Sequence, residues 1–353
     1  MAVTLRDIAA RVGTSEATVS LVLNGRQFHR VSQKMRERIE AVAKELNYRP
    51  NRQAQLLAGG KTKTIAVLVN RLHNQFFAEY LSAVEAGLSE HGYHAVPFET
   101  MSRPDRAEEL LDMIDQRLCD AIIALEYTGN PERSSDRGKD FPLTLRVETF
   151  GENHHRAGDS IDDPRTVSVD YLPATDRLFE VFKNQGARRV GILCDTRHDL
   201  ALPHTQQSAR ARAHTHALKH LALWQGPSQC VALSQESPLE DWAAATERLL
   251  RAEPEIDALL VHNATVTPAV LHQLAVLNRR VGDDIAVATY DDPISARWLG
   301  GGLTVVREPI AEVTQTLVAR TLDRVKRKVA TADPQPALHE AELIIRPSSS
   351  LAR

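Results

Sequence analysis

The sequence lacks any long apolar run and is poor in cysteine. No stretch approaches the roughly 18 consecutive apolar residues that a membrane-spanning helix needs, and residues 1–7 lack the apolar core of a signal peptide. Only three of the 353 residues are cysteines, namely Cys119, Cys194 and Cys230. Their odd number and wide spacing argue against a disulfide framework or a zinc site. We therefore expect a cytoplasmic protein, without a membrane partner, whose reduced thiols serve as packing residues.

The sequence also lacks the signatures of common catalytic and metal sites. The segment 59–62, Gly-Gly-Lys-Thr, ends like a phosphate loop, but Gln55 stands where the required first glycine would be. His216 and His220, with His214 nearby, could share a helix face and bind a metal, yet no zinc-protease signature accompanies them and a solvated face explains them better. No Gly-x-Ser-x-Gly motif is present, and no nucleophile stands beside a base. We expect no enzyme, no cofactor and no metal.

The net charge of −3 conceals an asymmetry along the chain. Residues 1–62 contain eleven Lys/Arg against five Asp/Glu, whereas the remainder contains 32 against 41. A basic surface is typical of proteins that bind DNA phosphates, although a merely solvated surface would have the same composition. With 42% hydrophobic residues, the chain is long enough for two or three cores.

The first residues predict a short amphipathic helix followed by a second one. Thr4 and Asp7 can form a capping box, and Gly13 supplies a turn, after which Thr14 or Ser15 can cap the second helix. The first helix has an apolar stripe of Leu5, Ile8, Ala9 and Val12. The second should bury Val19, Val22 and Leu23 and expose Glu16, Ala17, Ser20, Leu21 and Asn24. Two short helices across a glycine turn predict a helix-turn-helix, with an ordinary helical hairpin as the alternative.

A third helix and a linker complete this head. Ser32 can cap the helix, which ends before Tyr48 and carries an apolar stripe of Met35, Ile39, Val42 and Leu46. Residues 50–62 begin with a helix-compatible proline and end in glycines, but they are too few for a stable isolated helix. They therefore predict a linker that folds only when it is docked.

After Lys63 the pattern changes to short apolar runs that alternate with helical segments, such as the one over 76–91. Strands are expected over 64–69, 95–98, 121–125, 143–150, 190–193, 230–233, 258–262 and 285–290. This alternation predicts parallel, doubly wound sheets. So many strands suggest two Rossmann-like lobes with a ligand site in the cleft between them.

Several motifs resemble those of the lactose-repressor/galactose-repressor family of bacterial transcription regulators, in the same order and spacing. In the head they are Leu5-x-Asp7-Ile8-Ala9, Ser15-x-x-Thr18-Val19-Ser20-x-x-Leu23-Asn24-Gly25, Val31-Ser32, Leu46-x-Tyr48-Arg49-Pro50-Asn51 and Ala54-x-x-Leu57. In the body they are Asn74-Gln75-Phe76-Phe77, Val169-Asp170, and the segments 186–191, 287–292, 303–309 and 346–349. The resemblance spans the chain.

The resemblance implies that the second helix enters a DNA major groove. It further implies that residues 51–58 form a hinge helix in the minor groove, where Leu57 wedges into the central base step. The implied DNA-binding residues are Thr4, Ser15, Glu16, Ala17, Thr18, Ser20, Leu21, Asn24, Tyr48, Asn51, Ala54, Gln55 and Leu57. Leu21 replaces a frequent arginine of the family; it and Ala17 could contact thymine methyls, and Glu16 could accept from a cytosine amino group.

For the body, the resemblance implies two lobes of the periplasmic-binding-protein type with four effector-binding residues. Phe77 would stack on a ligand ring, and the guanidinium group of Arg210 would donate two parallel hydrogen bonds to the ligand. Asn263 and Asp291 would form hydrogen bonds with ligand hydroxyls. The alternatives are that Phe77 is a packed core aromatic and that Arg210 forms a surface ion pair. Arg212 could also match the family's cleft arginine in place of Arg210.

Three departures from the family pattern fall at the expected cleft. Ala264 replaces an aspartate, Ala213 replaces a glycine, and Gln75 replaces a proline. The loss of one carboxylate is compatible with a ligand that has fewer hydroxyls, with an anionic ligand, or with a cleft that no longer binds an effector.

The domains follow from these patterns. We expect a helix-turn-helix domain at 1–49, a hinge helix and linker at 50–62, a first lobe at 63–168 completed by about 293–325, and a second lobe at 169–292 completed by about 326–353. The predicted function is a transcription regulator, most simply a repressor. It would bind a palindromic double-stranded operator as a homodimer and respond to a small molecule, a sugar or related metabolite. The alternative is a two-lobed sugar-binding protein or enzyme whose head only mediates oligomerisation.

Overall fold

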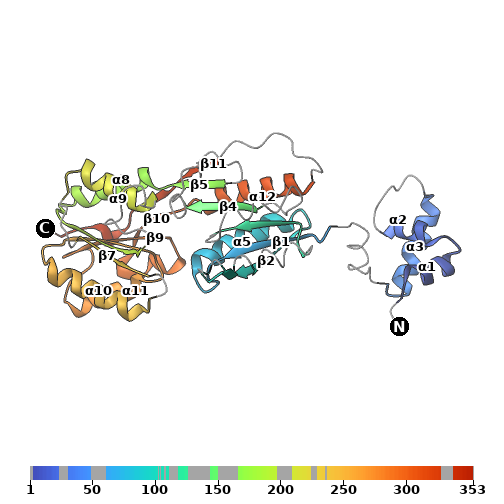
Figure 1. Cartoon of the computed structure of the whole chain (residues 1–353), viewed down its shortest axis with the longest axis horizontal. Coiled ribbons are helices and arrows are strands. Elements are labelled where there is room, and N and C mark those ends of the chain that lie inside the picture. The colour runs from blue at the N-terminus through green and yellow to red at the C-terminus, as the bar shows by residue number, and fades with distance from the viewer. Residues whose placement is uncertain are drawn as a thin grey trace. The chain divides into compact units, whose positions relative to one another are not determined.

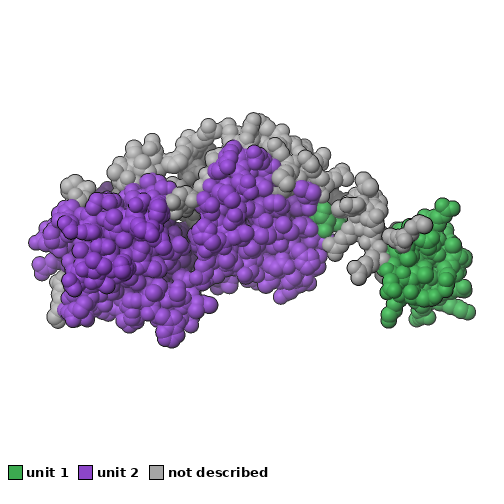
Figure 2. All heavy atoms as spheres, turned by 90° about the horizontal axis from the view of Figure 1, so that it is seen from below, with its two compact units in different colours: residues 1–62 green, residues 63–353 purple. Residues whose placement is uncertain are grey.

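The computed structural model describes residues 3–23, 31–48, 61–101, 103, 105–106, 109–110, 118–125, 144–149, 166–196, 209–223, 229–234, 237–326 and 337–352. The chain divides into two compact units, Met1–Thr62 and Lys63–Arg353, which Figure 2 shows in different colours. Within the described ranges, no helix is long and apolar enough to cross a membrane.

The smaller unit is built from α1 (Leu5–Val12), α2 (Glu16–Leu23) and α3 (Gln33–Glu45). The predicted capping box at the start of α1 is confirmed. The Thr4 hydroxyl accepts from the Asp7 N–H, and the Asp7 carboxylate accepts from the Thr4 N–H at 2.8 Å. Gly13 ends α1 in the left-handed conformation, with φ at 79°, which glycine adopts without strain. The turn between α1 and α2 therefore follows from local sequence.

A small apolar core holds these three helices together. Ile8, Val19 and Ile39, one from each helix, are completely buried. An ion pair of 2.6 Å between Arg11 and Glu45 adds a contact between α1 and α3. Ser32 occupies the position before α3, as predicted, but its side chain makes no capping hydrogen bond, so that part of the prediction is wrong.

The larger unit contains two six-stranded sheets, shown in Figure 1. The first consists of β1 (Thr64–Val69), β2 (His94–Glu99), β3 (Ala121–Ala124), β4 (Thr144–Thr149), β5 (Thr166–Asp170) and β11 (Ala337–Glu340). The second consists of β6 (Val190–Asp195), β7 (Cys230–Leu233), β8 (Ala258–Val261), β9 (Ala286–Tyr290), β10 (Thr304–Arg307) and β12 (Glu342–Ile344). Their strand orders are β11-β5-β4-β3-β1-β2 and β12-β10-β9-β8-β6-β7. The two sheets therefore have matching topologies, and each defines one lobe.

All strand pairs are parallel except β10 with β12, which is antiparallel. The predicted parallel, doubly wound lobes are thus confirmed. The prediction had no strand at β5, β10, β11 or β12. β11 and β12 have only four and three residues, and neither contains an apolar run long enough to be recognised.

Helices cover both faces of the second sheet. They are α8 (Leu172–Asn184), α9 (Ala209–His220), α10 (Leu239–Ala252) and α11 (Thr267–Val276). Figure 1 shows α8 and α9 on one side of this sheet and α10 and α11 on the other. Side chains alternate accordingly along β6, where Ile192 and Cys194 join the core shared with α8 and α9, and Leu193 joins the core under α10 and α11.

In the first lobe, α5 (Gln75–Ser89) packs against α12 (Ile310–Lys326). Gly87 of α5 allows this approach, because a Cβ atom there would lie 3.1 Å from Val318 of α12. Since α12 also contacts β3 and β4, it belongs to the first lobe although β10, which precedes it, belongs to the second.

The chain crosses between the lobes at three places: after β5, between β10 and α12, and between β11 and β12. This corrects the expected lobe boundaries after residue 293. Residues 304–307 lie in the second sheet because β10 pairs directly with β9, and residues 337–340 lie in the first because β11 pairs with β5. The crossings therefore fall later than the sequence suggested.

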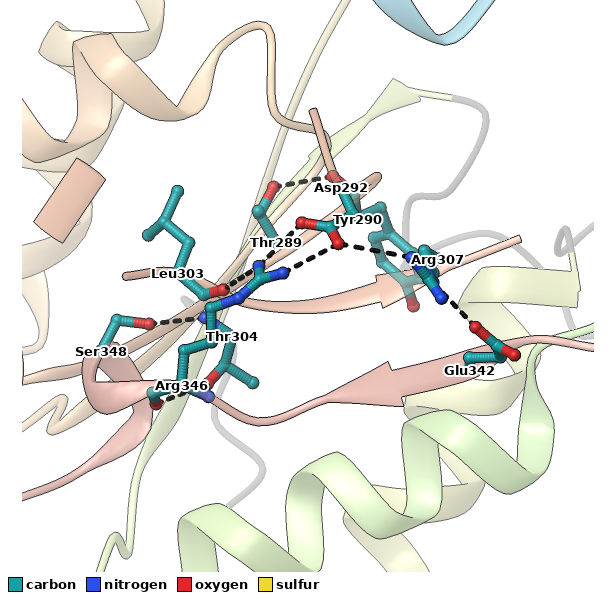
Figure 3. Close-up of polar contacts among 9 residues, drawn as sticks. All are labelled: Thr289, Tyr290, Asp292, Leu303, Thr304, Arg307, Glu342, Arg346 and Ser348. Carbon is teal, nitrogen blue, oxygen red and sulfur yellow. Dashed lines mark hydrogen bonds and ion pairs between the residues drawn. The ribbon is translucent and has the colours of Figure 1, made fainter. Parts of the chain in front are cut away.

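A polar clasp, shown in Figure 3, fastens the segment after β12 to the second sheet. Arg346 donates hydrogen bonds of 2.7 and 2.8 Å to the carboxylate of Asp292 and one of 2.8 Å to the carbonyl of Leu303. The Ser348 hydroxyl donates to the carbonyl of Val287 at 2.6 Å and accepts from the N–H of Thr304 at 2.8 Å. The ends of β9 and β10 are thereby held in place.

The three cysteines are thiols in apolar surroundings, as expected for packing residues. Cys119 lies in a small cluster beside β1 and β3, where burial raises its pKa to about 11. Cys194 and Cys230, distant in sequence, lie on neighbouring strands with their Sγ atoms 3.2 Å apart.

Candidate functional site

The outward face of α2 presents the residues that the sequence assigned to it. Val19 and Val22 point into the core. On the other side, Glu16 and Ala17 are exposed, and Ser20 and Leu21 are partly exposed one turn later. The spacing of 16, 17, 20 and 21 places these side chains on one helix face, which is what insertion into a groove requires.

Polar groups around α2 are held in fixed positions. The Ser15 hydroxyl accepts from the Thr18 N–H at 3.1 Å and lies 2.8 Å from the Thr18 hydroxyl, so Ser15 caps the helix. Tyr48 packs partly against the core of the head, and burial raises its pKa, which keeps its phenol protonated. The other predicted contacts, Asn24, Asn51, Ala54, Gln55 and Leu57, lie outside the described residues.

A pocket with about 340 Å³ of empty space lies between the two lobes of the larger unit. Its lining residues from the first lobe are Asn74, Gln75, Phe76 and Glu79, and those from the second are Ala264, Thr265, Asp291, Pro293 and Ser295. We call this the interlobe pocket.

Asp291, one of the predicted ligand contacts, lines the interlobe pocket. It follows β9 directly, and its backbone has a left-handed φ of 68°, which is unusual for a residue with a side chain. Its N–H donates to the Val306 carbonyl at 3.0 Å, which holds this conformation. Burial raises the pKa of Asp291 to about 7, while the nearby Arg210 charge opposes the shift.

Arg210 is buried on α9, so the surface ion pair considered from the sequence is wrong. Its guanidinium carbon lies 4.7 Å from the ring centroid of Tyr171 and 4.4 Å from that of Tyr290, within cation–π range. It also donates a hydrogen bond of 2.9 Å to the Tyr171 hydroxyl. The arginine is therefore enclosed by the protein's own aromatic rings.

A chain of hydrogen bonds extends from Arg210 through the crossing segments into the first lobe. The Tyr171 hydroxyl donates to one oxygen of Glu308, and the Tyr80 hydroxyl donates to the other. Arg210 belongs to the second lobe, Tyr80 to α5 of the first, and Tyr171 and Glu308 to two crossings. We call these four residues the interlobe relay. It connects the second lobe to the first by hydrogen bonds that pass through both crossings.

His214 contacts Tyr290, one of the two aromatic rings that enclose Arg210. Its Nε2 lies 2.7 Å from the Tyr290 hydroxyl, and its ring stacks on Phe179. Burial, reinforced by the charge of Arg210, lowers the pKa of His214 to about 3. The ring is therefore neutral at physiological pH and does not repel the arginine.

Two other predicted effector contacts are placed differently. Phe77 is only 5% exposed and lies in the core of the first lobe, while its neighbour Phe76 lines the pocket. The reason is the inward stripe of α5, on which Phe77 shares a face with Tyr80 and Val84. Asn263 does not line the pocket; its side-chain oxygen accepts from the N–H groups of residues 265 and 266 at 3.0 and 3.2 Å. It fixes the turn that leads into α11.

The sequence reasoning missed Tyr80, Tyr171, Tyr290, Glu308 and Glu79. Glu308 directly follows β10, and Tyr171 follows β5, so recognition of these two strands would have placed both residues at a lobe junction. Outside the pocket, His216 stacks on His220 and lies 3.3 Å from Asp176. The described residues contain no group of three or more His, Cys, Asp or Glu that could hold a metal ion.

Comparison with known proteins accounts for both units. The family model for bacterial regulatory proteins, lacI family, matches residues 4–51, and the model for the periplasmic binding protein-like domain matches residues 179–349. Residues 4–51 therefore form a lacI-family regulatory domain, joined to a body of the periplasmic-binding-protein-like type. The chain is thus a transcription regulator with a DNA-binding helix-turn-helix head and an effector-binding type of body.

Curated transcription regulators match this chain over nearly its whole length. The HTH-type transcriptional repressor PurR of Haemophilus influenzae (strain PittEE) is 27% identical over 349 residues, which cover 98% of both chains. The HTH-type transcriptional regulator CelR of Thermobifida fusca is 27% identical over 358 residues, again 98% of both. These relatives are transcription regulators, so the prediction that the chain is not an enzyme is confirmed.

Among solved structures, the lac repressor dimer bound to operator and the anti-inducer ONPF has a similar fold. Its TM-score is 0.79 at 22% identity, and the match covers 99% of this chain and 100% of that chain. The similarity supports the same fold for the helical head and for the two-lobed body.

Proposed function

We propose that this protein represses transcription in the cytoplasm by binding a palindromic operator as a homodimer, and that a small molecule in the interlobe pocket changes its DNA affinity. The observation that carries the proposal is the outward face of α2, where Glu16, Ala17, Ser20 and Leu21 stand on one side of a capped helix. Such a helix can present short side chains to base edges. The basic composition of residues 1–62 favours the surrounding phosphates.

Within this interface, the short apolar side chains of Ala17 and Leu21 fit thymine methyl groups, and the Glu16 carboxylate fits a cytosine amino group. Thr4, Ser15, Thr18 and Tyr48 carry hydroxyls in the same unit and are proposed to bond phosphates. For Asn24, Asn51, Ala54, Gln55 and Leu57, the proposed contacts rest on the family motifs in the sequence.

A homodimer is proposed because one short helix reads too few base pairs for specific recognition. Two large exposed apolar side chains on the second lobe support the proposal. Ile294, in the 3₁₀ helix η4 (Ile294–Arg297), is 77% exposed, and Trp298 directly after it is 82% exposed. Large exposed apolar side chains of this kind mark interaction surfaces. The lac repressor of similar fold was solved as a dimer on its operator.

Coupling between the pocket and DNA is proposed to run through the interlobe relay. A ligand that contacts Asp291 alters the electrostatic environment of Arg210, which is hydrogen-bonded to Tyr171 and through Glu308 to Tyr80 of α5. The angle between the lobes would change with the ligand and alter the spacing of the two heads. A sugar or related metabolite fits the hydrogen-bonding side chains of the pocket.

A mobility-shift titration with DNA from the promoter nearest the coding sequence tests the proposal. We expect a specific complex whose affinity falls by about 10³-fold or more between 50 and 200 mM salt, because several phosphate contacts release counterions. Leu57→Gly should abolish specific binding while leaving the dimer intact. If no complex forms at low salt, the head serves only in oligomerisation and the proposed function is wrong.

A further inference from the structure

The interlobe pocket differs from a neutral sugar site in its charge. Among the described residues, the charged ones that line it are Glu79 from α5 and Asp291 from the end of β9, and both are acidic. The two carboxylates are close enough for the charge of Glu79 to raise the pKa of Asp291. They belong to different lobes, so a ligand placed between them would contact both.

The neighbouring cations, Arg210 and Arg307, offset the charge of this pair only in part. Arg210 is buried between two tyrosine rings, does not line the pocket, and gives a hydrogen bond to Tyr171. Arg307 donates to Glu342 at 2.7 Å and lies 3.6 Å from Asp292. Both guanidinium groups are thus occupied by other partners.

The pKa values of both carboxyls are raised, which also indicates that the pocket has too little positive charge. For Asp291, burial together with the charges of Glu308 and Glu79 raises the pKa to about 7 against the opposing charge of Arg210. For Glu79, burial also raises the pKa, with Asp292 adding to the effect and Gln75 and Arg307 opposing it. A cation between them would stabilise both ionised forms.

Asp291 has hydrogen-bonding capacity to spare. In the part of the chain that the structure describes, its carboxylate accepts no hydrogen bond, whereas Glu79 accepts one of 2.9 Å from Gln75. A partly buried carboxylate without a donor is costly unless a ligand supplies one. The Asp291 side chain is therefore available for a ligand that donates.

An aromatic ring completes the pocket. Phe76 lines it, and edge-to-face contacts with Phe77 at 5.1 Å and Tyr80 at 5.0 Å hold its ring in place. Aromatic faces attract ammonium groups and pack against the apolar faces of sugar rings. A phosphate or carboxylate ligand would gain nothing from the ring and would be repelled by both acids.

We propose that the interlobe pocket binds a small organic ammonium compound, an amino sugar, whose charged nitrogen lies between Glu79 and Asp291 and whose ring packs on Phe76. This inference rests on the proposed function, since it names the effector of the same site. It excludes an anionic ligand, which was one of the ligand classes compatible with Ala264 in place of the family's aspartate.

Isothermal titration of the full-length protein with glucosamine, galactosamine and mannosamine tests the inference. Each amine is compared with its neutral parent sugar and with the parent's 6-phosphate. We expect at least one amine to bind ten-fold or more tightly than its parent and the phosphates not to bind. Glu79→Gln and Asp291→Asn should each weaken binding of that amine by about ten-fold or more, with circular dichroism confirming that the variants fold. Glu90→Gln, which changes an exposed acid at the end of α5, should not.

Two outcomes would overturn the inference: no amine binds better than its parent sugar, or Glu79→Gln and Asp291→Asn bind the amine as tightly as the unchanged protein. The mobility shift with promoter DNA is run on the same preparation. If DNA binds and no amine does, the ligand class is wrong and the proposed function stands. If no DNA binds, the proposed function fails whatever the amines do.

Discussion

The hydroxyl of Tyr171 donates a hydrogen bond to Glu308, a residue 137 positions later in the chain. Each of the two residues lies in a segment that crosses between the lobes, one after β5 and the other after β10. Because Tyr80 donates to the second oxygen, the Glu308 carboxylate joins two crossings to α5. Glu308 is only 3% exposed, so the junction is protected from water.

Replacement of Glu308 by alanine should lower the free energy of unfolding by roughly 2 to 5 kcal/mol, because it leaves two buried phenols without an acceptor. Glu308→Gln keeps one acceptor oxygen and a similar shape, so its loss should be clearly smaller. Urea denaturation followed by circular dichroism measures both. An alanine variant as stable as the unchanged protein would show that the relay does not hold the lobes.

The neighbouring residues Phe76 and Phe77 should behave differently when each is changed to alanine. Phe77→Ala should cost about 3 to 5 kcal/mol of stability, because it opens a cavity in the core of the first lobe. Phe76→Ala should cost less than half of that, since its ring is only partly buried, but it should weaken ligand binding. Thermal denaturation with and without ligand separates the two effects. Equal stability losses would contradict the assignment.

The stability of the larger unit should depend on pH through Asp291. Its pKa is about 7 in the folded protein and close to its ordinary value of 3.8 in the unfolded chain. The folded state therefore holds the proton more tightly, and stability should fall as pH rises from about 4 to about 7, by up to about 4 kcal/mol, and then level off. Asp291→Asn removes this dependence, so the variant should gain stability over the unchanged protein across that window. The free energy of unfolding is measured by denaturation of both proteins at pH 5 and at pH 8. If it changes by the same amount in the two proteins, the assignment is wrong.

The clasp between Asp292 and Arg346 predicts a double-variant result. The side chains are 7% and 15% exposed, so removing one partner leaves a largely buried charge. Asp292→Leu or Arg346→Met alone should destabilise by about 3 to 5 kcal/mol, and the two together should recover much of that loss. Guanidinium denaturation of the three variants completes the cycle. Additive losses would mean that the two side chains act independently.

The exposed tryptophan predicts the oligomeric state. Trp298→Glu places a charge on the proposed dimer surface, so the protein should sediment as a monomer and its operator affinity should fall by about ten-fold or more. Leu239→Glu is the matched control, because Leu239 is also partly exposed, at 45%, but lies at the start of α10. It should remain dimeric. A dimeric Trp298→Glu variant would place the interface elsewhere.

Much of the fold could be predicted because its signals are local. The capping box at Thr4 and the turn at Gly13 define α1 within a few residues, and β1 and β8 are apolar runs bounded by polar residues. That β10 belongs to the second lobe and β11 to the first could not be predicted, since it depends on which strands they pair with in the folded lobes. β11 also carries His339 and Glu340, which do not read as a buried strand.

The candidate site shows the same division. Asp291 and Arg210 could be named from motifs that lie within one segment. The role of Phe77 was assigned to the wrong member of an aromatic pair, because which side of α5 faces the core is decided by its packing in the lobe. The relay was not predictable, since Tyr171 and Glu308 meet only after both sheets have formed.

The last strand of each sheet comes from one short stretch, residues 337–344, which supplies β11 to the first lobe and β12 to the second. During synthesis on the ribosome, the head can fold as soon as α3 has emerged, but both sheets wait until β11 and β12 have emerged. A message interrupted after α12 would therefore yield a folded head on a body with two open sheet edges. Such unpaired edges can pair with strands of other chains. Premature termination would therefore produce an aggregating protein that still carries its DNA-binding unit.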